Sequence, residues 1–136
     1  MSRVQLALNV PDIDEAVAFY SKLFASEPAK RRPGYANFAV ADPPVKLVLF
    51  ENPGAEARLN HLGVEVVDTD TVDTELTRLS EAGVASTQER DTTRCYAKQD
   101  KFWVENAPNG ERRETYTVLA DSATFAGDAE RRSDGC

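Results

Sequence analysis

Residues 4–25 read VQLALNVPDIDEAVAFYSKLFA, and this stretch decides the predicted fold. Every second residue is apolar up to Val10, which is typical of a half-buried strand. Asp12 follows, with Glu15 three positions later, which is the spacing of a helix capping box. Apolar residues then recur at helical spacing as far as Ala25. The stretch therefore predicts a strand, a turn and a helix that packs on the strand.

The same pattern recurs in the second half of the chain. His61 follows Gln5 by 56 positions, and Asp68 follows Asp12 by the same interval. Such an internal repeat predicts two modules of similar topology. Further strands are predicted after each helix, at about 35–40, 45–50, 86–91, 94–105 and 112–119, with a hairpin turn at Gln99–Asp100 in the fourth of them.

The predicted fold class is α+β, with two βαβββ modules that pair into an incomplete barrel around a metal-binding cavity. We expect one domain over residues 1–120, with the first module at about 1–54 and the second at about 58–120. Residues 121–136 are rich in Asp, Ala, Ser, Gly and Arg, and they are predicted to form a flexible tail.

Composition narrows the classes of function. The chain has 136 residues with 23 acidic and 16 basic side chains, a net charge of −7, which argues against a nucleic-acid or anionic membrane partner. No apolar run approaches the roughly 20 residues that a bilayer requires. The first residues lack the apolar region of a secretory signal, so we expect a cytoplasmic protein. Its two cysteines are too few for a disulfide framework, and we expect them to be free thiols. We also expect a monomer or homodimer.

On each of the two repeated strands, one face is predicted to line a cavity. Gln5 and His61 lie at equivalent positions on faces of small and polar residues, and Glu114 lies on one face of the last predicted strand. With a single histidine in the chain, a multi-histidine metal site is excluded. An amide, an imidazole and a carboxylate form a variant of the facial triad that leaves positions open on Fe(II). Gln5, His61 and Glu114 are the predicted metal ligands.

Each of these residues also has a structural interpretation. A single histidine on a strand is more often structural than a ligand, and an amide is a weak ligand by itself. Glu114 follows Arg112 and Arg113, so it also fits a solvated strand residue. The repeat favours the metal site because it gives Gln5 and His61 matching positions.

Cys95 is the candidate nucleophile or soft ligand. Arg94 precedes it and favours its thiolate form electrostatically. The alternative is an inert, half-buried strand cysteine. Cys136 is the last residue of the sequence and is most simply an unattached thiol.

The sequence resembles the cadmium-induced protein and C–As lyase branch of the vicinal oxygen chelate superfamily. That superfamily also includes glyoxalase I, extradiol dioxygenases, and fosfomycin and bleomycin resistance proteins. The resemblance covers about residues 1–125, and its PGYANFA and NHLGVEV blocks are the most specific. It is carried by SRVQLALNVPDIDEAVAFYSKLF, PAKRRPGYANFAVADPPVKLVLFENPG, NHLGVEV, CYAKQDKFWV and ETYTVLADSATF.

The resemblance implies the two-module fold and an Fe(II)- and O2-dependent enzyme, although other divalent metals also fit. Its substrate would be a trivalent organoarsenical, which it would convert to inorganic arsenite. The family's metal ligands fall on Gln5, His61 and Glu114, and no further catalytic residue is implied. The substrate-binding residues would be Cys95, Arg94, Tyr96 and Cys136.

Two positions depart from the family pattern. Arg94 stands where relatives carry the first cysteine of a vicinal pair, and Arg113 stands where they carry tryptophan. One thiolate cannot chelate As(III), so Cys136 would have to supply a second sulfur or affinity would fall. Two alternatives therefore stand beside the enzyme. One is a cadmium- or arsenic-induced sequestering protein without turnover, and the other is a thiol transferase or ring-cleaving dioxygenase of the same superfamily.

Overall fold

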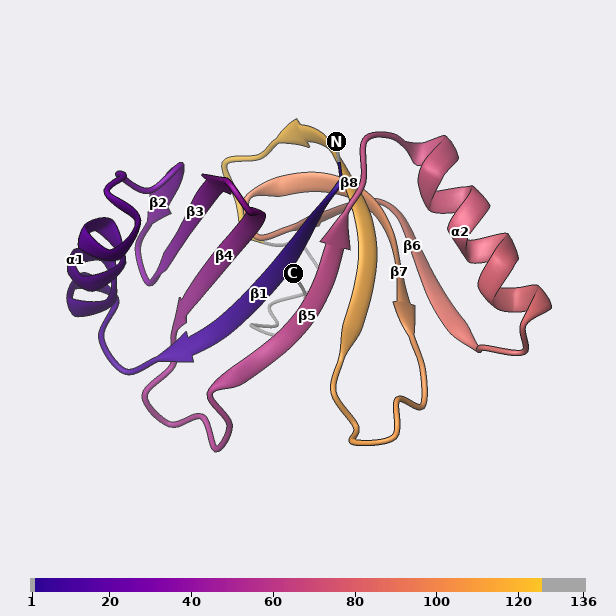
Figure 1. The fold of residues 1–136 in the computed structure, drawn as a ribbon, viewed down its shortest axis with the longest axis horizontal. Helices are drawn as coiled ribbons and strands as arrows, with labels where there is room; N and C mark the ends of the chain where they lie inside the picture. The colour runs from indigo at the N-terminus through magenta and orange to yellow at the C-terminus, as the bar shows by residue number, and fades with distance from the viewer. Residues whose placement is uncertain (1, 126–136) are drawn as a thin grey trace. The chain divides into compact units, whose positions relative to one another are not determined.

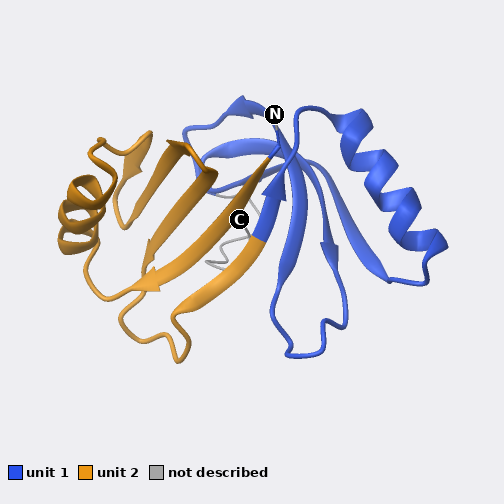
Figure 2. Cartoon of the chain, in the orientation of Figure 1, with its two compact units in different colours: residues 1–2, 63–136 blue, residues 3–62 orange. Residues whose placement is uncertain are grey.

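The structure is a computed structural model that describes residues 2–125. The chain divides into two compact units (Figure 2). Unit 2 contains residues 3–62, and unit 1 contains residues 1–2 and everything from residue 63 onward. Most of the predicted tail, residues 126–136 with Cys136, lies outside the described residues.

The element order is β-α-β-β-β twice over, which confirms the predicted fold class. In unit 2 the strand order is β2-β3-β4-β1, followed by the first half of β5 (Figure 1). Strand β1 pairs with β4 in parallel, and β3 pairs antiparallel with both β2 and β4. The elements are β1 (Arg3–Val10), α1 (Ile13–Phe24), β2 (Lys30–Arg32), β3 (Tyr35–Ala41), β4 (Pro44–Glu51) and β5 (Leu59–Glu65).

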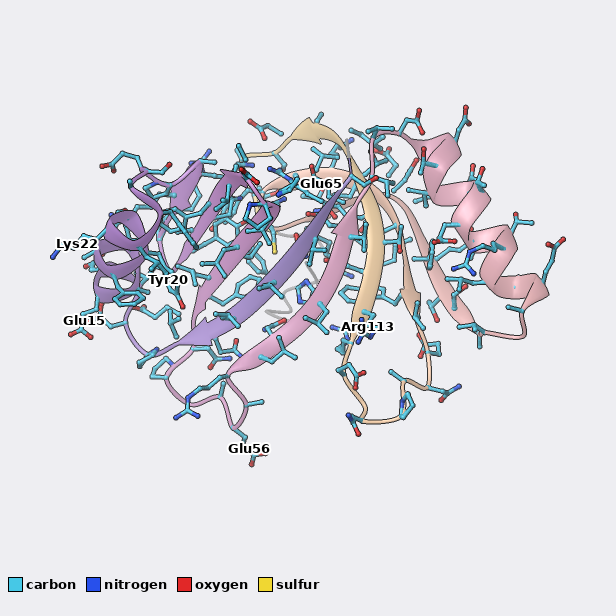
Figure 3. The ribbon with its side chains drawn as sticks, in the orientation of Figure 1. Glu15, Tyr20, Lys22, Glu56, Glu65 and Arg113 are labelled. Atoms are coloured by element: carbon cyan, nitrogen blue, oxygen red, sulfur yellow. The ribbon has the colours of Figure 1, made fainter. Side chains whose placement is uncertain are left out.

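Helix α1 begins as the capping pattern predicts. The side chain of Asp12 accepts a hydrogen bond from the backbone N–H of Glu15 at 3.0 Å. Glu15 and Lys22 point away from the strands, whereas Tyr20 lies on the side facing them (Figure 3). The buried cluster beneath the helix is built from both the helix and the strands: Ile13, Val17, Ala36, Phe38, Leu47 and Leu49.

The two faces of β1 are buried to different degrees. Leu8 and Val10 pack against the cluster beneath α1, while Val4 is 50% exposed. On the other face Gln5 is 2% exposed and Ala7 is fully buried. The polar face that the sequence assigns to a cavity is therefore the more deeply buried one.

Unit 1 holds the second half of β5 followed by strands β8-β7-β6, with α2 packed against them. Asp68 caps α2 by accepting from the backbone N–H of Thr71 at 2.8 Å. Gly83 follows the cap of this helix with a φ of 82°, a left-handed backbone conformation that favours glycine. The elements are α2 (Thr69–Glu81), β6 (Ser86–Arg94), β7 (Ala97–Val104) and β8 (Arg113–Asp121).

The hairpin turn predicted at Gln99–Asp100 is wrong. Strand β7 runs straight through these residues, and the turn lies at Cys95–Tyr96, where Arg94 pairs with Ala97. Both turn residues have positive φ, 49° and 64°. Two-residue hairpins favour this left-handed geometry because it matches strand twist, and it normally selects Asn or Gly. Neither residue type is present here, so the usual sequence signal is missing.

Beyond β8 the described chain returns to this turn. The backbone N–H of Ser122 donates to the Tyr96 carbonyl at 2.9 Å, and the Phe125 ring lies edge-on to Tyr96 with ring centroids 5.6 Å apart. Within residues 2–125 neither helix is long and apolar enough to cross a bilayer.

Candidate metal centre

Gln5 and His61, the first two predicted ligands, lie side by side in unit 2. Their side-chain Nε2 atoms are 3.0 Å apart, Gln5 is 2% exposed and His61 is fully buried. Strands β1 and β5 bring them together from positions far apart in the sequence. The ring of Phe50 borders the imidazole at a centroid distance of 6.4 Å. The structure thus brings together two residues that the repeat places at matching positions.

The hydrogen bonds around His61 suit a metal ligand. Its Nδ1 lies 2.8 Å from Oδ1 of Asn60, an oxygen that can only accept, so this contact is a hydrogen bond in the tautomer with the hydrogen on Nδ1. In that tautomer Nε2 keeps its lone pair and faces the Gln5 amide. Ligating histidines characteristically donate their other ring N–H to an oxygen in this way. Rotation of the Gln5 amide would present its oxygen beside Nε2, so these two residues fit a divalent metal.

Glu114, the third predicted ligand, lies in unit 1 on β8. It is 2% exposed, so the interpretation as a solvated strand residue is wrong. Its Oε1 accepts a hydrogen bond from Nζ of Lys101 on β7 at 2.7 Å, and both side chains are fully buried. One oxygen of the Glu114 carboxylate is therefore bound to the Lys101 ammonium.

Lys101 is surrounded by groups that stabilise its charge. Burial lowers the pKa of Lys101 from its usual value, and the Glu114 carboxylate opposes that effect. Its ammonium also lies 5.2 Å from the ring centroid of Trp103 and 5.6 Å from that of Tyr116. The Tyr116 hydroxyl in turn donates to Glu65, which Figure 3 labels at the end of β5.

No group of three or more His, Cys, Asp and Glu side chains that could hold a metal is present within residues 2–125. The predicted ligand set contains only one histidine and one carboxylate, because its third member is the Gln5 amide. It therefore does not count as a group of three His, Cys, Asp or Glu side chains.

Of the predicted substrate residues in unit 1, Arg94 ends β6, and Cys95 and Tyr96 form the β6–β7 turn. Cys95 is 6% exposed and takes part in a disulfide, so the expectation of a free thiol at Cys95 is wrong. Cys136 lies outside the described residues. Arg94 is 8% exposed and forms an ion pair with Glu89 at 3.3 Å. Its Nη1 is buried without a hydrogen-bond partner.

The two arginines before Glu114 make contacts elsewhere. Arg113, which Figure 3 labels, pairs with Glu111 at 3.6 Å. The side chain of Arg113 is 52% exposed. The guanidinium of Arg112 lies 4.0 Å from the ring centroid of Trp103. Arg113 is thus ion-paired with Glu111, whereas Glu114 is ion-paired with Lys101.

A model of the glyoxalase/bleomycin resistance protein/dioxygenase superfamily matches residues 3–113. The chain belongs to this superfamily. The resemblance of the sequence to this superfamily is therefore confirmed.

Two relatives within the superfamily are similar over nearly the whole chain. Cadmium-induced protein CadI of Mycobacterium tuberculosis is 63% identical over 134 residues, covering 98% of this chain and 87% of the relative. A trivalent organoarsenical cleaving enzyme of Thermomonospora curvata is 58% identical over 127 residues, covering 93% of this chain and 83% of the relative. Both belong to the branch that the sequence resembles.

A solved superfamily structure shows the same fold. The Mn(II)-bound glyoxalase from Novosphingobium aromaticivorans matches with a TM-score of 0.62 and 21% identity, covering 96% of this chain and 44% of that one. At this identity the similarity concerns the fold alone.

Three polar residues beside the predicted ligands have no role in the sequence-based prediction. In unit 1, Lys101 lies on the same face of β7 as Trp103, whose register partner is Glu114. In unit 2, Asn9 has the same parity as Gln5 on β1, and Asn60 gives no signal beyond its position next to His61.

Proposed function

We propose that the protein is an Fe(II)- and O2-dependent enzyme that cleaves the carbon–arsenic bond of trivalent organoarsenicals and releases inorganic arsenite. The observation that carries the proposal is the buried Gln5–His61 pair, with Nε2 of His61 directed at the amide and Nδ1 held by Asn60. The 58% identity to a trivalent organoarsenical cleaving enzyme supports the choice of substrate.

We propose Gln5, His61 and Glu114 as the ligands of one divalent metal. All three side chains are buried, and each offers a nitrogen or oxygen atom that Fe(II) accepts. Fe(II), when bound, supplies coordination positions at which O2 is activated. The role of the chain is to keep His61 and Glu114 oriented through Asn60 and Lys101.

We propose the segment of Arg94, Cys95 and Tyr96 as the substrate-binding segment, with Cys136 as the second sulfur ligand. Arsenic(III) is a soft centre and prefers thiolates, so Cys95 must first be reduced. Arg94, the neighbouring residue, is buried, and its guanidinium forms an ion pair with Glu89.

The test is aerobic incubation of reduced, Fe(II)-loaded protein with methylarsenite, followed by separation and quantification of arsenite. We expect arsenite from the native chain and none from His61→Ala, which removes the only imidazole. His61→Ala should also lose stoichiometric Fe(II) binding. Asn37→Ala is the matched control, because Asn37 is buried in the same unit and bonds to Tyr35. Unchanged iron binding in His61→Ala would refute the ligand assignment.

A second candidate is a sequestering protein without turnover. It is favoured by the 63% identity to cadmium-induced protein CadI and by Arg94, which removes one of two adjacent thiols. This candidate predicts stoichiometric retention of Cd(II) or methylarsenite by the reduced chain, with no release of arsenite under air. The incubation described above therefore separates the two candidates.

A further inference from the structure

Four consecutive hydrogen bonds join Gln5 to a backbone carbonyl in unit 2. The Gln5 amide meets Nε2 of His61 at 3.0 Å, and Nδ1 of His61 meets Oδ1 of Asn60 at 2.8 Å. Nδ2 of Asn60 donates to Oδ1 of Asn9 at 3.1 Å, and Nδ2 of Asn9 donates to the carbonyl of Ala57 at 3.0 Å.

The Ala57 carbonyl fixes which group donates and which accepts in every one of these hydrogen bonds, because a backbone carbonyl has no hydrogen to donate. Asn9 must turn its amino group to Ala57, so its oxygen faces Asn60. Asn60 must then turn its amino group to Asn9, so its oxygen faces His61. That oxygen requires a hydrogen on Nδ1 of the imidazole.

We propose that Asn9 and Asn60 are positioning residues that select the Nδ1–H tautomer of His61. The inference deepens the proposed function, because this tautomer keeps the lone pair of Nε2 available to a metal. The opposite tautomer would turn both asparagine amides around. Two carbonyl oxygens, those of Asn9 and Ala57, would then face each other and one hydrogen bond would be lost.

Backbone hydrogen bonds hold the Ala57 end of this hydrogen-bond series in place. The N–H of Asn9 donates to the Arg58 carbonyl at 2.7 Å, and the N–H of Asn52 donates to the Val10 carbonyl at 2.8 Å. These bonds hold the segment between β4 and β5 against the end of β1. The Ala57 carbonyl is therefore a fixed acceptor, and we expect the Nδ1–H tautomer to prevail by about tenfold or more.

The test is nuclear magnetic resonance of the metal-free full chain labelled with 15N-histidine. His61 is the only histidine in the sequence, so its two ring nitrogens need no assignment by mutation. At about pH 8.5, where an ordinary imidazole is neutral, we expect a protonated Nδ1 and an unprotonated Nε2. A predominantly protonated Nε2 in the native chain would overturn the inference.

Paired variants separate positioning from general stability. Asn60→Leu removes the acceptor and should shift the tautomer ratio toward Nε2–H by about tenfold. Asn60→Asp supplies a carboxylate that only accepts, so it should keep the native tautomer. Asn37→Leu, which breaks a side-chain hydrogen bond elsewhere in unit 2, should also keep it. A native ratio in Asn60→Leu would overturn the role of Asn60.

Asn9→Leu provides the test if Asn60→Leu does not fold. It leaves Asn60 in place but removes the group that fixes the orientation of the Asn60 amide. The tautomer ratio should therefore shift toward Nε2–H, and an unchanged ratio would contradict the inference.

Co(II) titration separates this outcome from the proposed function. A native chain that shows the Nδ1–H tautomer but binds no Co(II) would refute the metal site and leave the role of the asparagines standing.

Discussion

Nζ of Lys101 lies 2.7 Å from Oε1 of Glu114, and neither side chain reaches solvent. A buried ion pair of this kind depends on both partners. Removing one charge leaves the other desolvated and uncompensated, whereas removing both leaves a neutral contact. The pair therefore couples the stability of unit 1 to the residue proposed as its metal ligand.

Single substitutions of this pair should be more damaging than the double substitution. Lys101→Met or Glu114→Gln should each lower the free energy of unfolding by about 3–5 kcal/mol in the metal-free protein. Lys101→Met/Glu114→Gln should lower it by less than either single change. Urea unfolding of the four proteins measures the difference, and strictly additive effects would contradict a coupled pair.

Gln5→His should tighten divalent metal binding. Imidazole is a stronger donor than an amide oxygen, and the 3.0 Å separation from His61 already places position 5 at the candidate centre. Competition of Co(II) between the protein and a chelator measures the affinity. Gln5→Leu is the control and should weaken binding. Equal affinity in all three proteins would show that position 5 holds no metal.

Arg94→Cys should strengthen the capture of arsenic. A trivalent methylarsenical has two exchangeable positions, and the single thiolate of reduced Cys95 fills only one. An adjacent second sulfur acts at high effective concentration, so affinity should rise by about 100-fold or more. Titration of methylarsenite into the reduced proteins measures it, with Arg94→Ser as the control that removes the arginine without adding sulfur.

The competing account assigns the second sulfur to Cys136. If Cys136→Ala weakens methylarsenite binding as much as Cys95→Ala, that account is correct. If Arg94→Cys leaves both affinity and turnover unchanged, Cys95 is not at the substrate site.

The cap of α2 should lose its effect in acid. Hydrogen bonds from the side chain and then the backbone of Thr71 lower the pKa of Asp68. A carboxyl whose pKa is lower in the folded state contributes stability above its unfolded value, near 3.9, and that contribution disappears as pH falls through the folded value. Asp68→Ala should therefore melt below the native chain at pH 7, and the gap should close below about pH 4. A gap independent of pH would exclude the ionised cap.

Most of the fold could be predicted because it follows from local patterns. Alternation predicts β1, the Asp12–Glu15 capping box predicts the start of α1, and the repeat of Asp12 at Asp68 predicts the start of α2. Strand β2 was missed because it is three residues of Lys and Arg without an apolar face. The turn at Cys95–Tyr96 was missed because left-handed backbone there is imposed by strand pairing and not by residue type.

The candidate site could be predicted only in part. The repeat relates Gln5 to His61 by position, and the structure places them in contact. Asn60 has the opposite parity to His61 on the same strand, so alternation would place it away from the imidazole. Its amide nevertheless reaches Nδ1 of its neighbour. Such a contact depends on side-chain rotamers, which a strand pattern does not specify.

The hydrogen bonds from His61 through Asn60 and Asn9 to the carbonyl of Ala57 tolerate mutation differently at each position. Because the final acceptor belongs to the backbone, any residue that preserves the course of the segment before β5 can occupy position 57. The two asparagines have no such freedom, since few side chains donate and accept from a single planar group. Over evolution, position 57 can therefore change without loss of the acceptor, whereas we expect a change at Asn9 or Asn60 that removes the accepting oxygen to alter the tautomer of the only histidine in the chain.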